Sequence, residues 1–298
     1  MHSSDRKPRR FPLQLDQVSS VRLGGGGTPI GSTPAPRVSR EVLRPQALLH
    51  LAERDRQRQT APQGLGLDSA RVRQRMVQRL QLDGITHAGV LEAFSIVPRH
   101  LFVDTALVNQ AYEDTSLPIG LGQTISKPSV VAAMIQLLCV RPGLAKAEAH
   151  AGSAYLQPLG NCLEIGTGCG YQAALLGHLA RRVVSIERLR DLHLKARQSL
   201  EHVRASLPRW PDLRLIYGDG MMGHSPGGPY DTIIAAAGGS ALPQAWLDQL
   251  APGGRLVAPT EDERGGQVLV IVDRLSDGQL QQARAGAVLF VPLKSGIT

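Results

Sequence analysis

The sequence is poor in cysteine, in aromatic residues and in long apolar runs. Its three cysteines (Cys139, Cys162 and Cys169) form no C-x-x-C pair and are odd in number, which argues against a disulfide framework and against a zinc site. The nine histidines show no ligand spacing, so we expect no structural metal. No run of about 18 apolar residues occurs, so we expect no membrane-spanning helix. The chain also begins without the apolar core of a secretory signal, and we expect a cytoplasmic protein.

Aromatic residues make up only 4% of the chain, whereas glycine (32) and proline (20) are abundant, so we expect a flexible portion beside a folded one. The N-terminal segment fits the flexible portion, because it contains GGGGTPIGSTPAPR and shows no helical or strand period. We therefore predict a flexible basic extension over residues 1–67. The folded domain, residues 68–298, comprises a helical cap with a loop (68–135) and an α/β core (136–298).

Positive charge is concentrated in the first 60 residues, which hold eleven Arg or Lys against five acids, a net charge of +6. Since the whole chain carries +8, only +2 remains for the other 238 residues. A folded body so close to neutral argues against a basic groove for nucleic acid. For the extension itself, we favour a role in solubility, or no specific role, over weak binding to an acidic surface.

From residue 161 onward, short β-rich runs alternate with helical or loop segments, which predicts βαβ units and a mainly parallel sheet covered on both faces. We expect a doubly wound, Rossmann-like α/β fold with seven strands and an N-terminal helical cap. The last two strands are expected to pair antiparallel at a sheet edge. In the cap, apolar spacing predicts a helix over 69–82 and a second over 89–95. The expected strands are 161–165, 182–187, 213–219, 230–237, 254–259, 267–274 and 287–293.

The clearest chemical signal is LEIGTGCGYQAALL, residues 163–176, in which a strand ends in three glycines and a helix begins at once. Glycines there let a ligand approach backbone N–H groups at a helix start. A dinucleotide site would require G-x-G-x-x-G, but Tyr171 occupies the third position and the glycines form G-x-G-x-G. A nucleotide-like ligand other than a dinucleotide is therefore indicated.

Acidic residues also close the next two expected strands. Glu187 lies 21 residues beyond Gly166, where a carboxylate can bind both hydroxyls of a ribose, and Asp219 and Gly220 close the strand after it. Taken together, these positions resemble the S-adenosylmethionine site of class I methyltransferases. The donor-binding residues that this resemblance implies are Glu164, Gly166, Thr167, Gly168, Gly170, Glu187, Asp219 and Gly220.

The segment after the fourth strand narrows the choice of methyl acceptor. AAAGGSALP, residues 235–243, lacks the Asn or Asp and the aromatic group used to methylate base amines, and no metal or base set suited to a hydroxyl acceptor is evident. A carboxylate is ionised at pH 7 without help, since its unperturbed pKa is about 4. It has only to be held in place, for which the hydroxyls in GQTIS, residues 122–126, are suited.

Several segments closely resemble the protein-L-isoaspartate O-methyltransferase family over residues 69 to 293. They are VPRHLFV (97–103), AYEDTSLPIGLGQTISKP (111–128), the glycine loop, GDG (218–220), YDTIIAAAG (230–238) and LPQAWLDQLAPGGRLVAP (242–259). The resemblance implies methylation of the α-carboxylate of isoaspartyl residues in damaged proteins, with S-adenosylmethionine as donor. The ester then converts through a succinimide toward normal aspartate.

The same resemblance implies roles for residues of the acceptor loop. Ser126 matches the active-site serine of the family's T-I-S element and is expected to position the substrate carboxylate. The residues expected to shape the acceptor pocket around it are Pro118, Ile119, Gln123, Thr124 and Ile125.

Four other residues are harder to assign from the sequence. Cys169 departs from the small or hydroxyl residue common in this loop, and a catalytic thiol is disfavoured because no base is seen beside it. His100 suits either a ligand contact or a packed, satisfied histidine. Trp246 and Tyr171 are expected to serve as core or pocket wall.

Two alternative functions remain open from the sequence. One is a carboxyl methyltransferase of a small acid, and the other is a protein that binds S-adenosylmethionine without turnover. A monomer acting on isoaspartyl proteins, without nucleic acid or membrane, is our prediction.

Overall fold

The computed structural model describes residues 69–144, 157–204, 207 and 211–298. The predicted extension and residues 145–156, ahead of the first strand of the predicted core, lie outside the described residues. No helix in the described ranges is both long enough and apolar enough to cross a membrane.

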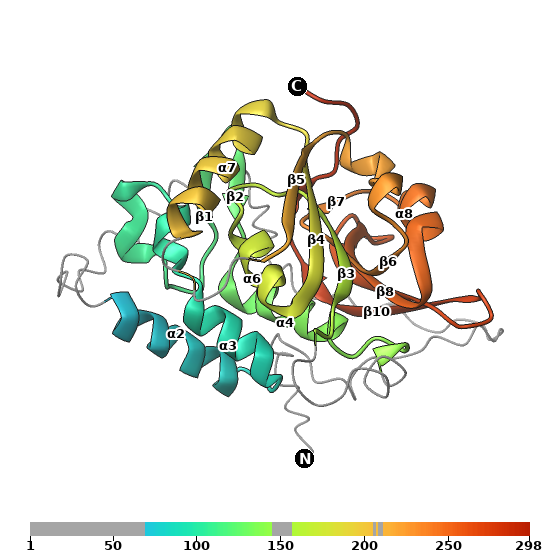
Figure 1. The fold of residues 1–298 in the computed structure, drawn as a ribbon, viewed down its shortest axis with the longest axis horizontal. Coiled ribbons are helices and arrows are strands. Elements are labelled where there is room, and N and C mark those ends of the chain that lie inside the picture. Colours follow the sequence, from blue (N-terminus) through green and yellow to red (C-terminus); the bar gives the residue numbers. More distant parts are fainter. Residues whose placement is uncertain (1–68, 145–156, 205–206, 208–210) are drawn as a thin grey trace, which may run out of the picture. The chain divides into compact units, whose positions relative to one another are not determined.

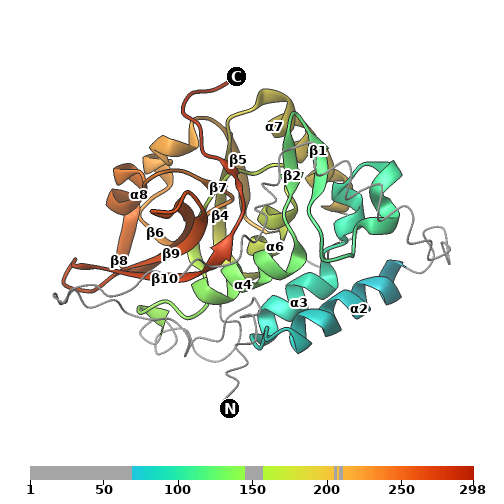
Figure 2. The ribbon, with the colours of Figure 1, turned by 180° about the vertical axis from the view of Figure 1, so that it is seen from behind.

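The described chain begins with a helical cap (Figures 1 and 2), as predicted. In α2 (Ser69–Leu82), Met76 and Leu80 lie one turn apart on the buried face. The N-terminus of α3 (Ala88–Ile96) is capped by the His87 side chain, which accepts a hydrogen bond from the Val90 N–H. Two short 3-10 helices come next, η2 (Arg99–Phe102) and η3 (Thr105–Gln110).

A small antiparallel hairpin leads from the cap into the core. Its strands are β1 (Leu117–Gly120) and β2 (Gln123–Ile125), and α4 (Pro128–Leu138) comes directly after them. Pro128 lies in the first turn of α4, where its missing N–H costs nothing. The Asp114 carboxylate accepts hydrogen bonds from both the N–H and the hydroxyl of Ser129, which fixes the start of this helix.

A seven-stranded sheet in the order β10-β9-β8-β6-β3-β4-β5 forms the centre of the domain. Five strands pair in parallel, and β9 pairs antiparallel with both β8 and β10, so the predicted sheet class is confirmed. The chain winds outward from β3 in one direction to β5 and then in the other to β8. The strands are β3 (Gly160–Ile165), β4 (Ala180–Glu187), β5 (Leu213–Tyr217), β6 (Tyr230–Ala235), β8 (Leu250–Glu261), β9 (Gln267–Arg274) and β10 (Leu280–Val288).

The last strand differs from the prediction. Residues 287–293 were expected to form it, but β10 begins at Leu280 and ends at Val288, and the chain then leaves the sheet. The segment before 287 is polar because β10 is an edge strand with exposed side chains, so it carries little of the apolar signal of a strand. Val291–Pro292 instead form β11, which pairs in parallel with β7 (Ala237–Gly238).

Each face of the sheet has its own apolar core, because neighbouring residues of a strand point to opposite sides. Cys162 belongs to the core beneath the cap, α4 and the helices α6 (Tyr171–Leu179) and α7 (Arg190–Arg204). The next residue, Leu163, belongs to the core that packs on Trp246 of α8 (Gln244–Gln249). The parallel strands are thus covered on both sides, and their carboxyl ends remain available for a ligand.

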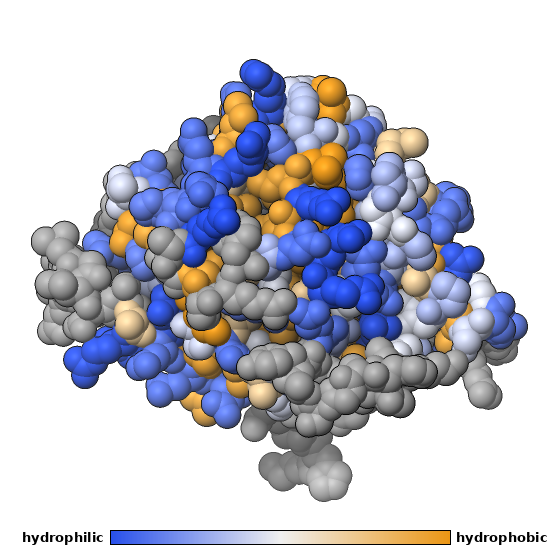
Figure 3. All heavy atoms as spheres, viewed as in Figure 1, coloured by the Kyte–Doolittle hydropathy of each residue, from blue (hydrophilic) through white to orange (hydrophobic). Residues whose placement is uncertain are grey.

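The other sheet edge is the strand β5, whose side chains are half-buried or exposed. In Figure 3 the apolar residues gather in the upper middle of the face, where Figure 1 places β5, amid a mostly hydrophilic surface. Arg214 within this strand forms an ion pair with Asp212 (3.7 Å). Charge on an edge strand opposes pairing with another chain.

Candidate active site

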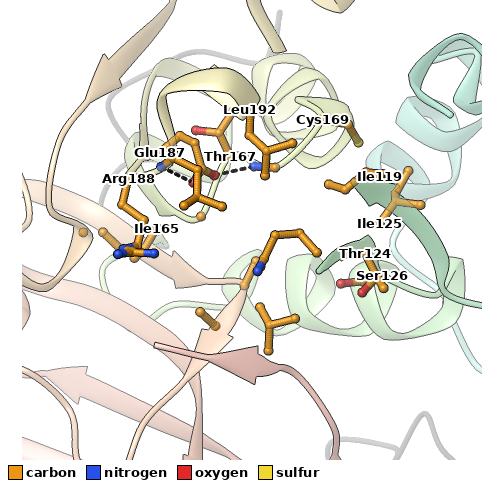
Figure 4. Close-up of a pocket in the computed structure, with 18 of the residues that line it drawn as sticks. Ile119, Thr124, Ile125, Ser126, Ile165, Thr167, Cys169, Glu187, Arg188 and Leu192 are labelled. Atoms are coloured by element: carbon orange, nitrogen blue, oxygen red, sulfur yellow. Dashed lines mark hydrogen bonds between the residues drawn. The ribbon is translucent and has the colours of Figure 1, made fainter. Parts of the chain in front are cut away.

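A cavity of about 420 Å³ lies at the carboxyl ends of the parallel strands. This is the crevice in which doubly wound sheets bind ligands, and its volume suits a small organic ligand. Figure 4 shows the cavity with side chains from the sheet on one side and from the β1–β2 hairpin on the other. The sheet side is lined by Ile165 and residues 166–169 after β3, residues 186–189 at β4, Gly220 after β5 and residues 236–237 after β6.

The glycine loop forms the floor of this cavity. Gly166, Gly168 and Gly170 have φ angles of 89°, 56° and 91°, a region that residues with a side chain rarely adopt. A Cβ at Gly168 would also lie 3.2 Å from the Ile119 Cδ1 atom on the opposite wall. Gly168 therefore keeps open the passage between the loop and the hairpin.

The Glu187 carboxylate lies at the end of β4 and points into the same space. Its Oε2 accepts a hydrogen bond from the Gly168 N–H (2.9 Å) and its Oε1 accepts one from the Leu189 N–H (3.0 Å) (Figure 4). Each carboxylate oxygen can accept a further bond. Glu187 thus braces the glycine loop and still has lone pairs for two ribose hydroxyls.

Opposite this carboxylate, the hairpin and the residues after it present two hydroxyls. The side chains of Thr124 and Ser126 point toward the cavity in Figure 4, and neither hydroxyl is bonded to another described residue. Gln123, Ile125 and Ile119 line the same wall. This wall can donate hydrogen bonds to an anionic oxygen without placing an acidic group beside it.

The hairpin is joined to the donor side by Lys195 of α7. Its Nζ donates a hydrogen bond to the carbonyl oxygen of Ile119 (2.9 Å). Because Ile119 also faces Gly168, this bond holds the hairpin over the glycine loop. The two walls of the cavity are therefore joined by a side chain of the core that bonds to the backbone of the hairpin.

The C-terminal segment supplies the remaining edge of the cavity. The stretch 291–294 lines it, and the last residues bond to the ends of β4 and β5. The Asp219 Oδ2 accepts a bond from the Gly296 N–H (2.6 Å), the Arg188 Nε donates to the Gly296 carbonyl (2.9 Å), and the Thr298 N–H donates to the Arg188 carbonyl (3.0 Å). The C-terminus thus crosses the ends of two strands that border the site.

The family model of protein-L-isoaspartate(D-aspartate) O-methyltransferase matches residues 71–298 of this chain. The chain belongs to this family. It is 55% identical to a protein-L-isoaspartate O-methyltransferase of Methylibium petroleiphilum, with 99% of both chains covered, and 53% identical to that of Leptothrix cholodnii, with 99% of this chain and 97% of the relative covered. A Plasmodium falciparum protein of the same name, crystallised with S-adenosyl-L-homocysteine, has a similar fold, with a TM-score of 0.60 and 23% identity over 74% of this chain and 98% of that one.

Family membership confirms the prediction that this chain is an S-adenosylmethionine-dependent methyltransferase. The similar crystal structure confirms the predicted fold class. The cavity brings most of the predicted site residues of this methyltransferase together. The predicted residues that line it are Ile119, Gln123, Thr124, Ile125, Ser126, Gly166, Thr167, Gly168, Glu187 and Gly220.

Four predicted site residues do not line the cavity. Pro118 is exposed because it alternates with the buried Leu117 and Ile119 along β1. Gly170 lies at the start of α6, against Leu200. Asp219 bonds the Met221 N–H through one oxygen and the C-terminal segment through the other. Glu164, the fourth, is fully buried beneath the loop.

Sequence reasoning missed the contributions of Arg188 and of the segment 291–294. Arg188 comes directly after Glu187, the residue predicted to bind the ribose, so its position in the sequence could have indicated that it lies at the site. The C-terminal segment offered no such indication in its own residues, because it reaches the site through contacts with distant segments: the pairing of β11 with β7 and the bonds of Gly296. Among the described residues, no group of three or more His, Cys, Asp or Glu side chains could hold a metal ion.

The surroundings of the four residues that were harder to assign from the sequence limit their roles. His100 bonds the Tyr112 hydroxyl through Nδ1 (2.7 Å) and does not line the cavity. Trp246 is buried, and its indole N–H donates to the Gly220 carbonyl (2.7 Å), which supports the turn after β5. Cys169 and Tyr171 both line the cavity. Burial raises the pKa of the Cys169 thiol, so it remains protonated and is a poor nucleophile at neutral pH.

Glu164 acts on the donor loop through a buried chain of hydroxyls. The Ser185 hydroxyl donates a short hydrogen bond to the Glu164 Oε2, and the Thr167 and Ser185 hydroxyls lie 2.6 Å apart. Burial raises the pKa of Glu164 to about 8. At neutral pH the carboxyl group is therefore mostly protonated. The hydrogen bonds from Glu164 through Ser185 thus hold Thr167 of the glycine loop without burying a charge.

The raised pKa predicts a change in stability with pH. Between the ordinary glutamate pKa of about 4.3 and the folded-state value of about 8, the folded protein holds a proton that the unfolded chain releases. Glu164 therefore reduces stability as pH rises through this window, by up to about 1.4 kcal/mol per pH unit. Glu164→Gln cannot titrate, so urea unfolding at pH 5.5 and 7.5 should show the wild type losing stability relative to this variant. An equal change in the free energy of unfolding of both proteins between these pH values would contradict the prediction.

Proposed function

We propose that this methyltransferase transfers the methyl group of S-adenosylmethionine to the α-carboxylate of L-isoaspartyl residues in damaged proteins and peptides. The observation that carries the proposal is the pair of hydroxyls, Thr124 and Ser126, which bond to no other residue in the described part of the chain and face the Glu187 carboxylate and the glycine loop across one cavity. One wall offers donors to an anion and the other offers acceptors to a ribose. The acceptor class agrees with the family to which the chain belongs.

The donor half fits the proposed cofactor. Glu187 presents acceptor lone pairs, the three glycines keep side chains out of the loop, and the turn at Gly220 is held from behind by Trp246. When bound, S-adenosylmethionine supplies a methyl carbon made electrophilic by the attached sulfonium. The chain has to align the acceptor with that carbon and exclude water.

The acceptor half needs no general base. An isoaspartyl α-carboxylate is already ionised at pH 7, since its ordinary pKa lies near 4 or below. We assign Ser126 to orient one carboxylate oxygen by donating its hydroxyl proton, while the other oxygen faces the donor. A neutral hydroxyl weakens the nucleophile less than a tight pair with an arginine would. Thr124, Gln123, Ile125 and Ile119 shape the pocket around this group.

The ester then begins repair without further help from the enzyme. The nitrogen of the next backbone amide attacks the ester carbonyl, methanol leaves and a succinimide forms. Water opens this ring to normal aspartate or again to isoaspartate, and the latter can be methylated once more.

The decisive experiment compares paired peptides. Purified protein is incubated with methyl-labelled S-adenosylmethionine and one peptide carrying either isoaspartate or normal aspartate, and base-labile label is counted. We expect label only in the isoaspartyl peptide. Equal labelling of both peptides, or transfer to small carboxylic acids alone, would reject the proposed substrate.

The same assay tests the role of the N-terminal extension. We propose that residues 1–67 are dispensable for methyl transfer, since the family model begins at residue 71. A chain starting at residue 68 should then label the peptide at the rate of the full chain. We further propose that the enzyme acts as a monomer in the cytoplasm and binds no nucleic acid, which agrees with the net charge of +2 over residues 61–298.

A further inference from the structure

Arg99 is a buried cation without an acidic partner. Its exposed fraction is 0%, yet no Asp or Glu of the described residues forms an ion pair with it. The Asp114 carboxylate acts on it only through space and is occupied by Ser129. An arginine remains charged in proteins, and burying an unpaired charge is costly. The groups that the guanidinium binds must therefore offset the cost of burying this charge.

The guanidinium holds three backbone carbonyl groups, two before the hairpin and one after it. Its Nε donates to the Ala111 carbonyl (2.7 Å), and its Nη2 donates to the carbonyls of Ser126 (2.8 Å) and Thr115 (3.4 Å). None of these residues lies within a helix or strand, so regular structure does not satisfy their carbonyls. Arg99 therefore fixes the main chain on both sides of the hairpin that forms the acceptor wall.

The contact with Ser126 is the important one for the reaction. Ser126 lies between the end of β2 and the start of α4, and its hydroxyl faces the cavity. Holding its carbonyl fixes the rotation of the main chain at this residue, and with it the direction of the Cα–Cβ bond, which limits the positions that the hydroxyl can occupy to a few rotamers. The guanidinium contacts Ser126 only at the backbone, so it leaves the hydroxyl available to a substrate.

Arg99 also reaches the donor side. Its guanidinium carbon lies 4.9 Å above the centre of the Tyr171 ring, a cation–π arrangement. Tyr171 is the first residue of α6 and comes directly after Gly170 of the glycine loop. One side chain thus connects the residue that orients the acceptor with the helix that begins at the donor loop.

We propose that Arg99 is a positioning residue for methyl transfer, which sets the Ser126 hydroxyl in register with the donor loop. This inference rests on the proposed role of Ser126. A lysine at this position keeps the charge but has one nitrogen in place of a planar fork, so it cannot hold three carbonyls in the same geometry.

A double-mutant cycle tests the proposal. We compare wild type, Arg99→Lys, Ser126→Ala and the double variant, measuring kcat and KM for an isoaspartyl peptide and the Kd of S-adenosylhomocysteine by calorimetry. Arg99→Lys should lower kcat/KM for the peptide at least tenfold and change the Kd less than threefold. In the Ser126→Ala background the same substitution should cost less than threefold, because the group through which it acts is gone.

Arg141 supplies the matched control. It is also buried, and it donates to the carbonyls of Pro158 and Gly253, near the amino ends of β3 and β8 and not at the acceptor wall. Unlike Arg99, it also forms an ion pair, with Asp231 (3.7 Å). Arg141→Lys should lower the melting temperature without this dependence on Ser126.

Equal losses from Arg99→Lys in both backgrounds would overturn the proposal, as would a kcat/KM within twofold of wild type. If neither Arg99→Lys nor Arg99→Met folds, the residue is structural and the proposal is rejected. A wild type that binds S-adenosylhomocysteine but never labels isoaspartyl peptide would instead reject the proposed function.

Discussion

Glu187→Ala should weaken the binding of S-adenosylhomocysteine by about 100-fold, the largest effect on donor binding that the site predicts. The substitution removes acceptors for two ribose hydroxyls, and hydrogen bonds to a charged group contribute about 1.5–3 kcal/mol each. It also leaves the Gly168 N–H of the donor loop without its partner. A combined loss near 3 kcal/mol corresponds to about two powers of ten in Kd. Calorimetric titration of the purified variant measures this change directly.

Two variants control for indirect effects. Glu187→Gln keeps the shape and one acceptor oxygen, so its Kd should fall between those of the wild type and Glu187→Ala. Glu201→Ala removes an exposed glutamate of α7 that forms an ion pair with Arg204, and should leave the Kd unchanged. An unaltered affinity in Glu187→Ala would show that the ribose lies elsewhere.

Ser126→Ala should have the second largest effect, and it should fall on the chemical step. Losing the hydroxyl removes one hydrogen bond to the acceptor carboxylate, which we expect to lower kcat/KM for an isoaspartyl peptide by about 1–3 kcal/mol, or roughly 5- to 150-fold. The donor should bind as before, because Ser126 belongs to the opposite wall. Peptide kinetics and donor calorimetry on the same preparation separate these two effects.

Ser129→Ala is a matched control three residues along the chain. Its hydroxyl is buried and bonded to Asp114, so the loss should appear as about 1 kcal/mol of stability and leave kcat/KM for the peptide nearly unchanged. Unchanged methyl transfer by Ser126→Ala would remove this serine from the mechanism.

The sheet and the donor loop could be predicted from short sequence patterns, because the residues that these elements require are close together in the sequence. The glycines after β3 are required by positive φ angles, and the acid that ends β4 is placed by the geometry of a parallel sheet. The strand β10 was misplaced because its exposed residues lack an apolar pattern, as expected of an edge.

The features that could not be predicted depend on contacts between distant segments. The approach of Gly296 to Asp219 and that of Arg99 to Ser126 join segments separated by 77 and 27 residues. No short pattern indicates either contact. Pro118 differs from these, because here the local arrangement contradicts the prediction. The family resemblance implied that Pro118 forms a pocket wall, whereas the alternation of buried and exposed residues along β1 turns its ring outward.

The C-terminal bonds have a consequence for engineering the site. Gly296 and Thr298 make bonds to Asp219 and Arg188, so residues 296–298 brace the border of the donor cavity although they belong to no strand of the sheet. Shortening the chain by these three residues would break the bonds and leave all seven strands in place. The shape of the cofactor pocket can therefore be altered separately from the sheet that supports it.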